Sequence, residues 1–185
     1  MHAAQYLKRF FESQSGSFSR KTYSKGDILL HQGEIEKKIY IIQSGAVRAV
    51  YRNENEEFTI RFGYKNSVIT SLSSFLRKEP SSFSIEVIRK SDIIQLSGSS
   101  FQKATESNPE FKNFYQLILE ELITQQMERE IDLLTSSPLH RYRRVILRSP
   151  ALFNEIPAKY IASYLRMSPE TLSRLRKIDL NQVSE

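Results

Sequence analysis

A group of side chains able to make directed polar contacts lies within residues 168–177. It contains Glu170 and Arg174, which are four residues apart and therefore project from the same face of a helix. An arginine can donate two hydrogen bonds to the O6 and N7 atoms of guanine, and a glutamate can accept one from cytosine N4. Thr171 and Ser173 flank this pair. The segment therefore contains side chains able to contact base edges in DNA.

Chemistry of other kinds finds little support in the sequence. The chain contains no cysteine, which excludes disulfides, thiolate zinc sites, iron–sulfur clusters and a cysteine nucleophile. His2, His31 and His140 lie far apart in the chain and form no metal-binding motif. A metal-dependent jelly-roll enzyme needs clustered histidines, so we expect neither enzymatic activity nor a cofactor. Haem bound through His31 is the remaining alternative, although a lone histidine in a turn is usually a surface residue.

Basic residues are unevenly distributed along the chain. The net charge is +6, and residues 1–134 hold 18 basic and 17 acidic side chains. Residues 135–177 hold nine basic side chains and two acidic ones, a net charge of +7. A near-neutral body followed by a basic segment indicates a polyanionic partner, most simply nucleic acid. A solvated basic face without a ligand is the alternative.

Length and composition are those of a globular protein with one large domain or two small ones. The chain has 185 residues, of which 39% are hydrophobic and 26% are charged. No segment approaches the roughly 20 apolar residues of a membrane span, and the N-terminus lacks the apolar core of a signal peptide. We therefore expect a cytoplasmic protein with no membrane partner.

Short strands separated by turns are predicted from Tyr23 to about Phe101. β-Branched and aromatic residues alternate there with polar ones, as in strands with one buried face. The expected strands are 28–30, 38–42, 46–51, 58–62, 83–88 and 93–96. Frequent turns between short strands favour an antiparallel sandwich or jelly roll. Because helical patterns follow, the expected fold class is α+β.

A long helix is predicted from Pro109 to Leu134. Roughly 25 residues at about 1.5 Å each span nearly 40 Å, which is more than packing against one small sheet requires. Its apolar residues recur mostly at steps of three and four. They are Phe111, Phe114, Tyr115, Ile118, Leu122, Met127, Ile131 and Leu134. The stripe allows packing inside one monomer or, as we favour, pairing with a second copy.

Shorter helices are predicted over residues 138–147, 158–165 and 169–177. In the first helix, Arg141, Arg143 and Arg144 are expected to point outward. The other two helices are joined by three residues, and Ser168 is a favourable N-cap for a helix that begins at Pro169. Two helices joined in this way are typical of a helix-turn-helix motif.

Four short segments carry a resemblance to a known family. They are Lys25-Gly26-Asp27-Ile28-Leu29, Gln32-Gly33-Glu34, Tyr40-Ile41-Ile42 and Ser44-Gly45-Ala46-Val47. In order and spacing they resemble the cyclic-nucleotide-binding jelly roll of the Crp/Fnr family of bacterial transcription regulators. Their glycines are expected at corners where the chain needs positive φ or close backbone approach. The resemblance implies an effector domain over residues 1–108, a dimerisation helix over 109–134 and a helix-turn-helix DNA-binding domain over 135–185.

The recognition helix of the same family provides the most specific similarity. Ser168-Pro169-Glu170-Thr171-Leu172-Ser173-Arg174 resembles it in the variant of the Bacteroidetes type. The resemblance implies a homodimer that binds an inverted repeat in double-stranded DNA, with RNA polymerase and an unidentified small-molecule effector as further partners. The expected DNA-binding residues are Ser168, Glu170, Thr171, Ser173, Arg174 and Lys177, together with Lys159 and Tyr160.

Two features of the DNA-binding segment depart from the family pattern. Arg166 stands at the turn position usually held by glycine, where a side chain in the left-handed conformation costs roughly 1 kcal/mol. Only eight residues follow Lys177, so the β-wing of the family is expected to be truncated. Contacts to DNA phosphates would then be made by Lys159, Tyr160, Arg141, Arg143 and Arg144.

The charged anchors of a cyclic-nucleotide pocket are missing. Family members that bind a nucleotide carry Gly-Glu and, about ten residues later, Arg followed by Ser or Thr, which bind ribose and phosphate. Ser71-Leu72-Ser73-Ser74 and Pro80-Ser81-Ser82-Phe83 stand in those places. Lys65, Arg77 and Lys78 nearby are expected to be solvated. We therefore expect a transcription regulator that does not respond to cyclic AMP. The alternative is a dimeric sensor with a degenerate DNA-binding domain, acting through a protein partner.

Overall fold

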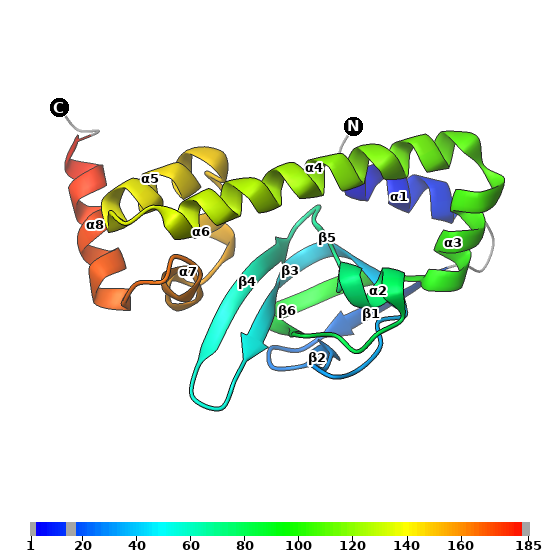
Figure 1. Ribbon diagram of the computed structural model, residues 1–185, viewed down its shortest axis with the longest axis horizontal. Helices are drawn as coiled ribbons and strands as arrows, with labels where there is room; N and C mark the ends of the chain where they lie inside the picture. The colour runs from blue at the N-terminus through cyan, green and yellow to red at the C-terminus, as the bar shows by residue number, and fades with distance from the viewer. Residues whose placement is uncertain (1–2, 14–17, 183–185) are drawn as a thin grey trace. The chain divides into compact units, whose positions relative to one another are not determined.

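The computed structural model describes residues 3–13 and 18–182 and divides into two compact units. Unit 1 runs to Leu119 and unit 2 begins at Glu120. The division lies within helix α4 (Pro109–Leu134), which has the bounds predicted from the sequence (Figure 1). Each half of this helix therefore belongs to a different unit. Among the described residues, no helix is long and apolar enough to cross a membrane.

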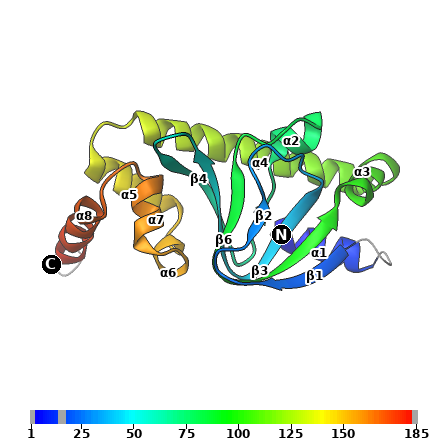
Figure 2. The same cartoon turned by 90° about the horizontal axis from the view of Figure 1, so that it is seen from below.

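Unit 1 is built on one antiparallel sheet of six strands. They are β1 (Phe18–Tyr23), β2 (Ile28–Leu30), β3 (Lys38–Arg52), β4 (Glu57–Tyr64), β5 (Val68–Ile69) and β6 (Ser84–Ser97). The main order is β1-β6-β3-β4, while β2 pairs with β6 and β5 pairs with β3. The strands are curved (Figure 2). Apolar side chains from several of them form one buried cluster. The predicted α+β class with an antiparallel jelly roll is therefore confirmed.

The two central strands are longer than the sequence predicts. The expected strands 38–42 and 46–51 are joined into β3, and the last two expected strands are likewise joined into β6. The register between β3 and β6 shifts around Gly45, where a Cβ would lie 2.1 Å from the carbonyl oxygen of Lys90. This glycine therefore forms a bulge against β6 and does not end the strand. Positive φ, as expected, occurs at Gly26, Gly33 and Gly45.

Two apolar clusters form the core of unit 1. The first fills the roll and contains Leu30, Tyr40, Ile42, Val47, Ala49, Ile69, Ile85, Val87 and Ile93. The second joins the sheet to α1 (Ala3–Glu12), α3 (Gly98–Ser107) and the start of α4. In it, the rings of Phe101 and Phe111 meet edge to face with centroids 5.1 Å apart. The sequence patterning does not predict α1, whose residues Ala4, Leu7 and Phe11 are buried in this cluster.

Unit 2 is helical throughout its described residues. After the second half of α4 come α5 (Pro138–Arg148), α6 (Leu152–Glu155), α7 (Ala158–Tyr164) and α8 (Pro169–Gln182). Ile161 and Ala162 of α7 are buried, and so are Leu172 and Leu175 of α8. Helices α7 and α8 are in contact with each other. Helix α8 is longer than predicted, and no strand follows it within the described part of the chain.

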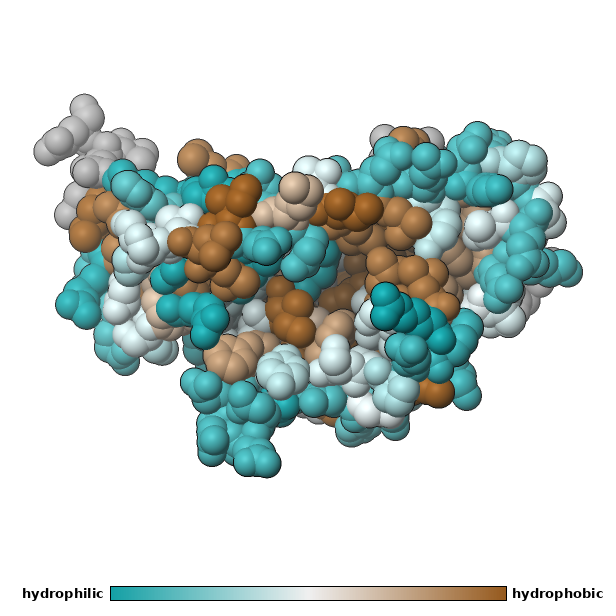
Figure 3. Space-filling view, in the orientation of Figure 1, coloured by the Kyte–Doolittle hydropathy of each residue, from teal (hydrophilic) through white to brown (hydrophobic). Residues whose placement is uncertain are grey.

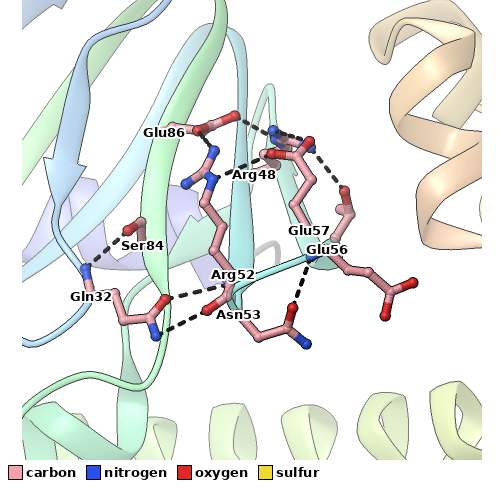
Figure 4. A network of polar contacts seen from close by, with 9 residues as sticks. Gln32, Arg48, Arg52, Asn53, Glu56, Glu57, Ser84 and Glu86 are labelled. Atoms are coloured by element: carbon pink, nitrogen blue, oxygen red, sulfur yellow. Dashed lines mark hydrogen bonds and ion pairs between the residues drawn. The ribbon is translucent and has the colours of Figure 1, made fainter.

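An ion-pair network links three strands of the roll (Figure 4). Arg48 on β3 is only 3% exposed, and its guanidinium pairs with Glu86 on β6 and, at 2.8 Å, with Glu57 on β4. Arg52 also pairs with Glu86. Burial alone would raise the pKa of Glu86, but hydrogen bonds from Arg52 and Arg48 hold this pKa below its ordinary value of 4.5. The network therefore favours the ionised carboxylate.

Acid is expected to destabilise unit 1 through Glu86. A carboxylate whose pKa is depressed in the folded state contributes stability above the unfolded pKa of 4.5, and this contribution is lost as the pH falls through the folded pKa. Denaturant unfolding between about pH 6 and about pH 3 should show the loss, and Glu86→Gln should remove part of it. Glu54→Gln, at the exposed tip of the β3–β4 hairpin, is the control. An identical pH profile in wild type and Glu86→Gln would contradict this role.

Candidate nucleic-acid interface

The turn between α7 and α8 closes as a Schellman motif. The N–H of Arg166 donates to the carbonyl oxygen of Ser163 at 3.1 Å, and the N–H of Met167 donates to that of Ala162 at 3.1 Å. Arg166 has a φ of +51°, which is the left-handed conformation that the family pattern assigns to glycine. The turn therefore keeps its geometry in spite of the departure noted in the sequence.

Arg166→Gly is expected to relieve backbone strain in this turn. Glycine adopts positive φ without the Cβ clash, so the glycine variant should be about 1 kcal/mol more stable than Arg166→Ala. The alanine variant is the matched control because it loses the same side-chain contacts and keeps the Cβ. Thermal unfolding should give a higher midpoint for the glycine variant. Equal midpoints for the two variants would show that the turn is unstrained.

Ser168 caps the N-terminus of α8, as predicted. Its Oγ accepts a hydrogen bond from the N–H of Thr171 at 3.2 Å, and Pro169 occupies the first helical position. The exposed Glu170 follows in the first turn. A hydrogen bond from its own backbone N–H lowers the pKa of the Glu170 carboxyl, and Ser168 and the charge of Arg174 lower it further. The start of α8 is therefore arranged to hold a carboxylate.

The residues predicted to contact DNA are accessible on α7 and α8. Leu172 and Leu175 are buried, so the polar face of α8 lies opposite its packing face. Thr171 and Tyr160 are partly exposed, and the Nζ of Lys159 lies over the ring of Tyr160, 4.7 Å from its centroid. The exposed members of the predicted set are Lys159, Ser168, Glu170, Ser173, Arg174 and Lys177.

The arginines of α5 correct one expectation from the sequence. Arg141 is only 8% exposed, and its Nη1 donates to a backbone carbonyl that follows α4, at 2.8 Å. Arg144 pairs with Glu128 at 2.7 Å and with Asp132 at 3.0 Å. Arg143 is partly buried. The expected outward orientation is therefore wrong for Arg141 and Arg144. Their guanidinium groups instead bind carboxylates and a backbone carbonyl at the end of α4.

Sequence reasoning also missed Asp132, which is fully buried between two arginines. It pairs with Arg144 and with Arg148, both on α5. The only signal in the sequence is its spacing of four residues from Glu128, which puts both carboxylates on one face of α4. That spacing is equally common on solvated helices, so it does not predict burial.

The net charge of each structural unit differs from the division of charge seen in the sequence. Residues 120–185 hold ten basic and nine acidic side chains, and residues 1–119 hold 17 and 12. Unit 2 therefore has a net charge of +1, in contrast to the basic segment that begins at residue 135. The difference arises because the second half of α4 adds five acidic residues and one arginine, and residues 178–185 add two more acidic residues. In the described part of unit 2, the exposed basic side chains are Lys159, Arg166, Arg174, Arg176 and Lys177.

Serines occupy the segments 71–74 and 80–83, where nucleotide-binding members of the family carry their anchors, and they hydrogen-bond within the chain. Ser71, Ser74 and Ser81, in and beside α2 (Leu72–Arg77), are at most 2% exposed. Ser81 Oγ donates to Ser71 Oγ at 2.9 Å, and Ser74 Oγ accepts from the N–H of Glu36 at 2.9 Å. These hydroxyls therefore bind the chain itself. The nearby cations are exposed, as expected, at Lys65, Arg77 and Lys78.

The remaining candidate for metal or haem ligation, His31, lies exposed in a turn. Its backbone N–H donates to the carboxylate of Glu34 at 3.0 Å. Within residues 3–13 and 18–182, the structure contains no group of three side chains that could hold a metal ion.

Comparison with known proteins supports this architecture. Residues 20–108 match the family model of the cyclic nucleotide-binding domain. FixK2 from Bradyrhizobium japonicum superposes with a TM-score of 0.73 at 19% identity, over 89% of this chain and 85% of that one. A CooA mutant from Carboxydothermus hydrogenoformans superposes with a TM-score of 0.69 at 18% identity, over 96% of this chain and 84% of that one. CLP, described as a c-di-GMP responsive global regulator from Xanthomonas campestris, superposes with a TM-score of 0.67 at 13% identity, over 97% of this chain and 93% of that one.

These likenesses define the fold of the chain. No curated protein sequence matches it. At identities below 20%, the solved structures show that this chain shares their fold. Residues 20–108 are similar to domains of the cyclic nucleotide-binding type.

Proposed function

We propose that the chain is a homodimeric, sequence-specific DNA-binding transcription regulator of the Crp/Fnr type that does not respond to cyclic AMP. The observation that carries this proposal is α8, which is capped by Ser168 and exposes Glu170 and Arg174 opposite its buried leucines. In a helix-turn-helix, such a helix enters the major groove and reads bases near its N-terminal end. The exposed cations of α7, the turn and α8 would contact phosphates.

Gel retardation tests whether the protein reads DNA at all. A promoter fragment should be retarded in excess competitor DNA, since specific binding exceeds non-specific binding by about 10³-fold or more. Ser168→Ala is a useful partner variant, because it removes the cap of α8 and should weaken retardation without deleting a cation. Retardation that disappears with the first addition of competitor would contradict sequence-specific binding.

Helix α4 supplies the proposed dimer interface, although its seam differs from the predicted stripe. The first four stripe residues pack in or against the core of unit 1; they are Phe111, Phe114, Tyr115 and Ile118. The large apolar residues that remain exposed on α4 include Leu117, Met127, Ile131 and Leu134, which fit one heptad spacing. Apolar side chains recur along α4 on the molecular surface (Figure 3). A second copy of α4 would cover them in a parallel pair.

Cyclic AMP and cyclic GMP are expected not to bind at physiological concentrations. A buried cyclic phosphate needs a fixed cation, and the position expected for that cation holds Ser81, which is buried and hydrogen-bonded to Ser71. Titration calorimetry with each nucleotide should show no saturable heat. A dissociation constant in the low micromolar range would contradict this part of the proposal.

The near-neutral charge of unit 2 favours a second candidate function. With a net charge of +1, this unit has little non-specific attraction for DNA. The chain would then be a dimeric sensor whose helical unit no longer reads sequence and which acts through a protein partner. Dimers that show no preference among DNA sequences would support this alternative.

A further inference from the structure

A buried arginine connects α4 to the end of α7. Arg129 is only 8% exposed, and its guanidinium stacks over the ring of Tyr164, 3.7 Å from the centroid. Its Nη2 also donates to the backbone carbonyl oxygen of Tyr164. Tyr164 is the last residue of α7. One side chain of α4 therefore contacts both the final ring and the final carbonyl of this helix.

A second arginine reaches the turn that follows. Arg141 of α5 donates to the carbonyl oxygen of Thr135 at 2.8 Å and, over 3.5 Å, to that of Arg166. Cations near the C-terminal carbonyls of a helix are favoured by its dipole. Asp132 adds a third link, because its carboxylate pairs with Arg148 and fixes α4 against α5. Three contacts therefore hold α4, α5 and the end of α7 together.

These contacts carry a cost that stability alone does not explain. Arg129 Nη1 and Arg141 Nε are buried and have no hydrogen-bond partner among the described residues. An unsatisfied buried donor is unfavourable, and apolar side chains often replace buried ionic groups without loss of stability. The arginines fit a role in which the geometry of the contact matters more than its contribution to folding.

The place of Tyr164 in the chain shows what such geometry would control. Ser168, the N-cap of α8, lies four positions after Tyr164, and the turn between them is closed by two backbone hydrogen bonds. The turn therefore has little freedom of its own. An anchor at Tyr164 fixes where α8 begins relative to α4.

We propose that Arg129 is a positioning residue that sets the place of α8 relative to α4 and thereby the half-site spacing that the dimer accepts. This inference rests on the proposed function. The two copies of α8 in a dimer must enter major grooves about one helical turn apart. One inserted base pair moves a half-site by about 3.4 Å and turns it by about 35°. A rigid link between α4 and α8 discriminates against that change, whereas a loose link tolerates it.

The test compares the selected operator with the same operator carrying one additional central base pair. The wild type should bind the lengthened site about tenfold more weakly, an effect similar to that of one mismatched base pair. Arg129→Met keeps an unbranched side chain without the guanidinium. This variant should bind the lengthened site only about threefold, or less, more weakly than the selected operator. Arg129→Lys should resemble it, because an ammonium group cannot replace the planar stack. Affinity for an isolated half-site should be the same in all three proteins.

Val145→Ala separates positioning from stability. Val145 is a buried residue of α5 that takes no part in these arginine contacts, so the variant loses stability and should keep the wild-type spacing preference. Equal spacing profiles in wild type and Arg129→Met would overturn the inference, as would an equally broadened profile in Val145→Ala. Failure of the proposed function is distinguishable, because the wild type itself would then bind neither operator, and that outcome would overturn both.

Discussion

Replacing Met127 and Ile131 together with glutamate is expected to turn a dimer into a monomer. Both side chains are exposed on α4, at 61% and 46%, and the seam would bury them against a second copy. Burying four unpaired carboxylates in one interface should raise the dimer dissociation constant at least about a hundredfold. Light scattering at tens of micromolar should give twice the chain mass of 21.6 kDa for wild type, and the single chain mass for the variant.

A charge-matched control makes this result specific to the seam. The double variant Gln126→Glu and Ser136→Glu adds the same charge at exposed positions that are not part of the apolar seam. It should leave the dimer intact. A wild-type protein that scatters as a monomer at tens of micromolar would contradict the interface. Equal dissociation of both double variants would show that net charge, and not the seam, controls assembly.

Arg174→Ala is expected to weaken binding to the selected operator by about 1–3 kcal/mol and to relax the preference at one base pair in each half-site. Arg174 is exposed on the face of α8 opposite Leu172 and Leu175, where its guanidinium can make two hydrogen bonds to guanine. Fluorescence anisotropy on a set of operators with single substitutions measures both effects. Undiminished preference at every position would contradict the role of Arg174.

Lys159→Ala provides the contrast, because Lys159 is expected to contact phosphate. This variant should weaken binding to all sequences about equally and reduce the salt slope by about 1. Its sequence preference should match that of wild type. If Lys159→Ala altered the preferred sequence, the division between base contacts on α8 and phosphate contacts on α7 would be wrong.

Signals that act over one helical turn were sufficient to predict the local structure at this site. Pro109 begins α4 and Ser168 caps α8, because a fixed φ and a capping hydroxyl act within a few residues. The amphipathic pattern of α8 likewise separates its buried leucines from Glu170 and Arg174. For these features the sequence contains all the groups that determine the outcome.

Features that depend on distant partners could not be predicted in this way. Arg144 appeared solvated because its partners, Glu128 and Asp132, lie on another helix 16 and 12 residues earlier. Periodicity indicates which face of a helix is apolar, but it does not indicate which charged residue meets an opposite charge after packing. The sequence also did not predict that β3 continues through Gly45, because the bulge there depends on the close approach of β6.

Selection of binding sites from a random double-stranded library tests the central claim most directly. The wild-type protein is expected to enrich an inverted repeat whose half-site centres lie about 10 base pairs apart, as required by a two-fold dimer with one copy of α8 in each major groove. Enrichment of no sequence, or only of a site without two-fold symmetry, would contradict a homodimeric regulator that reads DNA through α8.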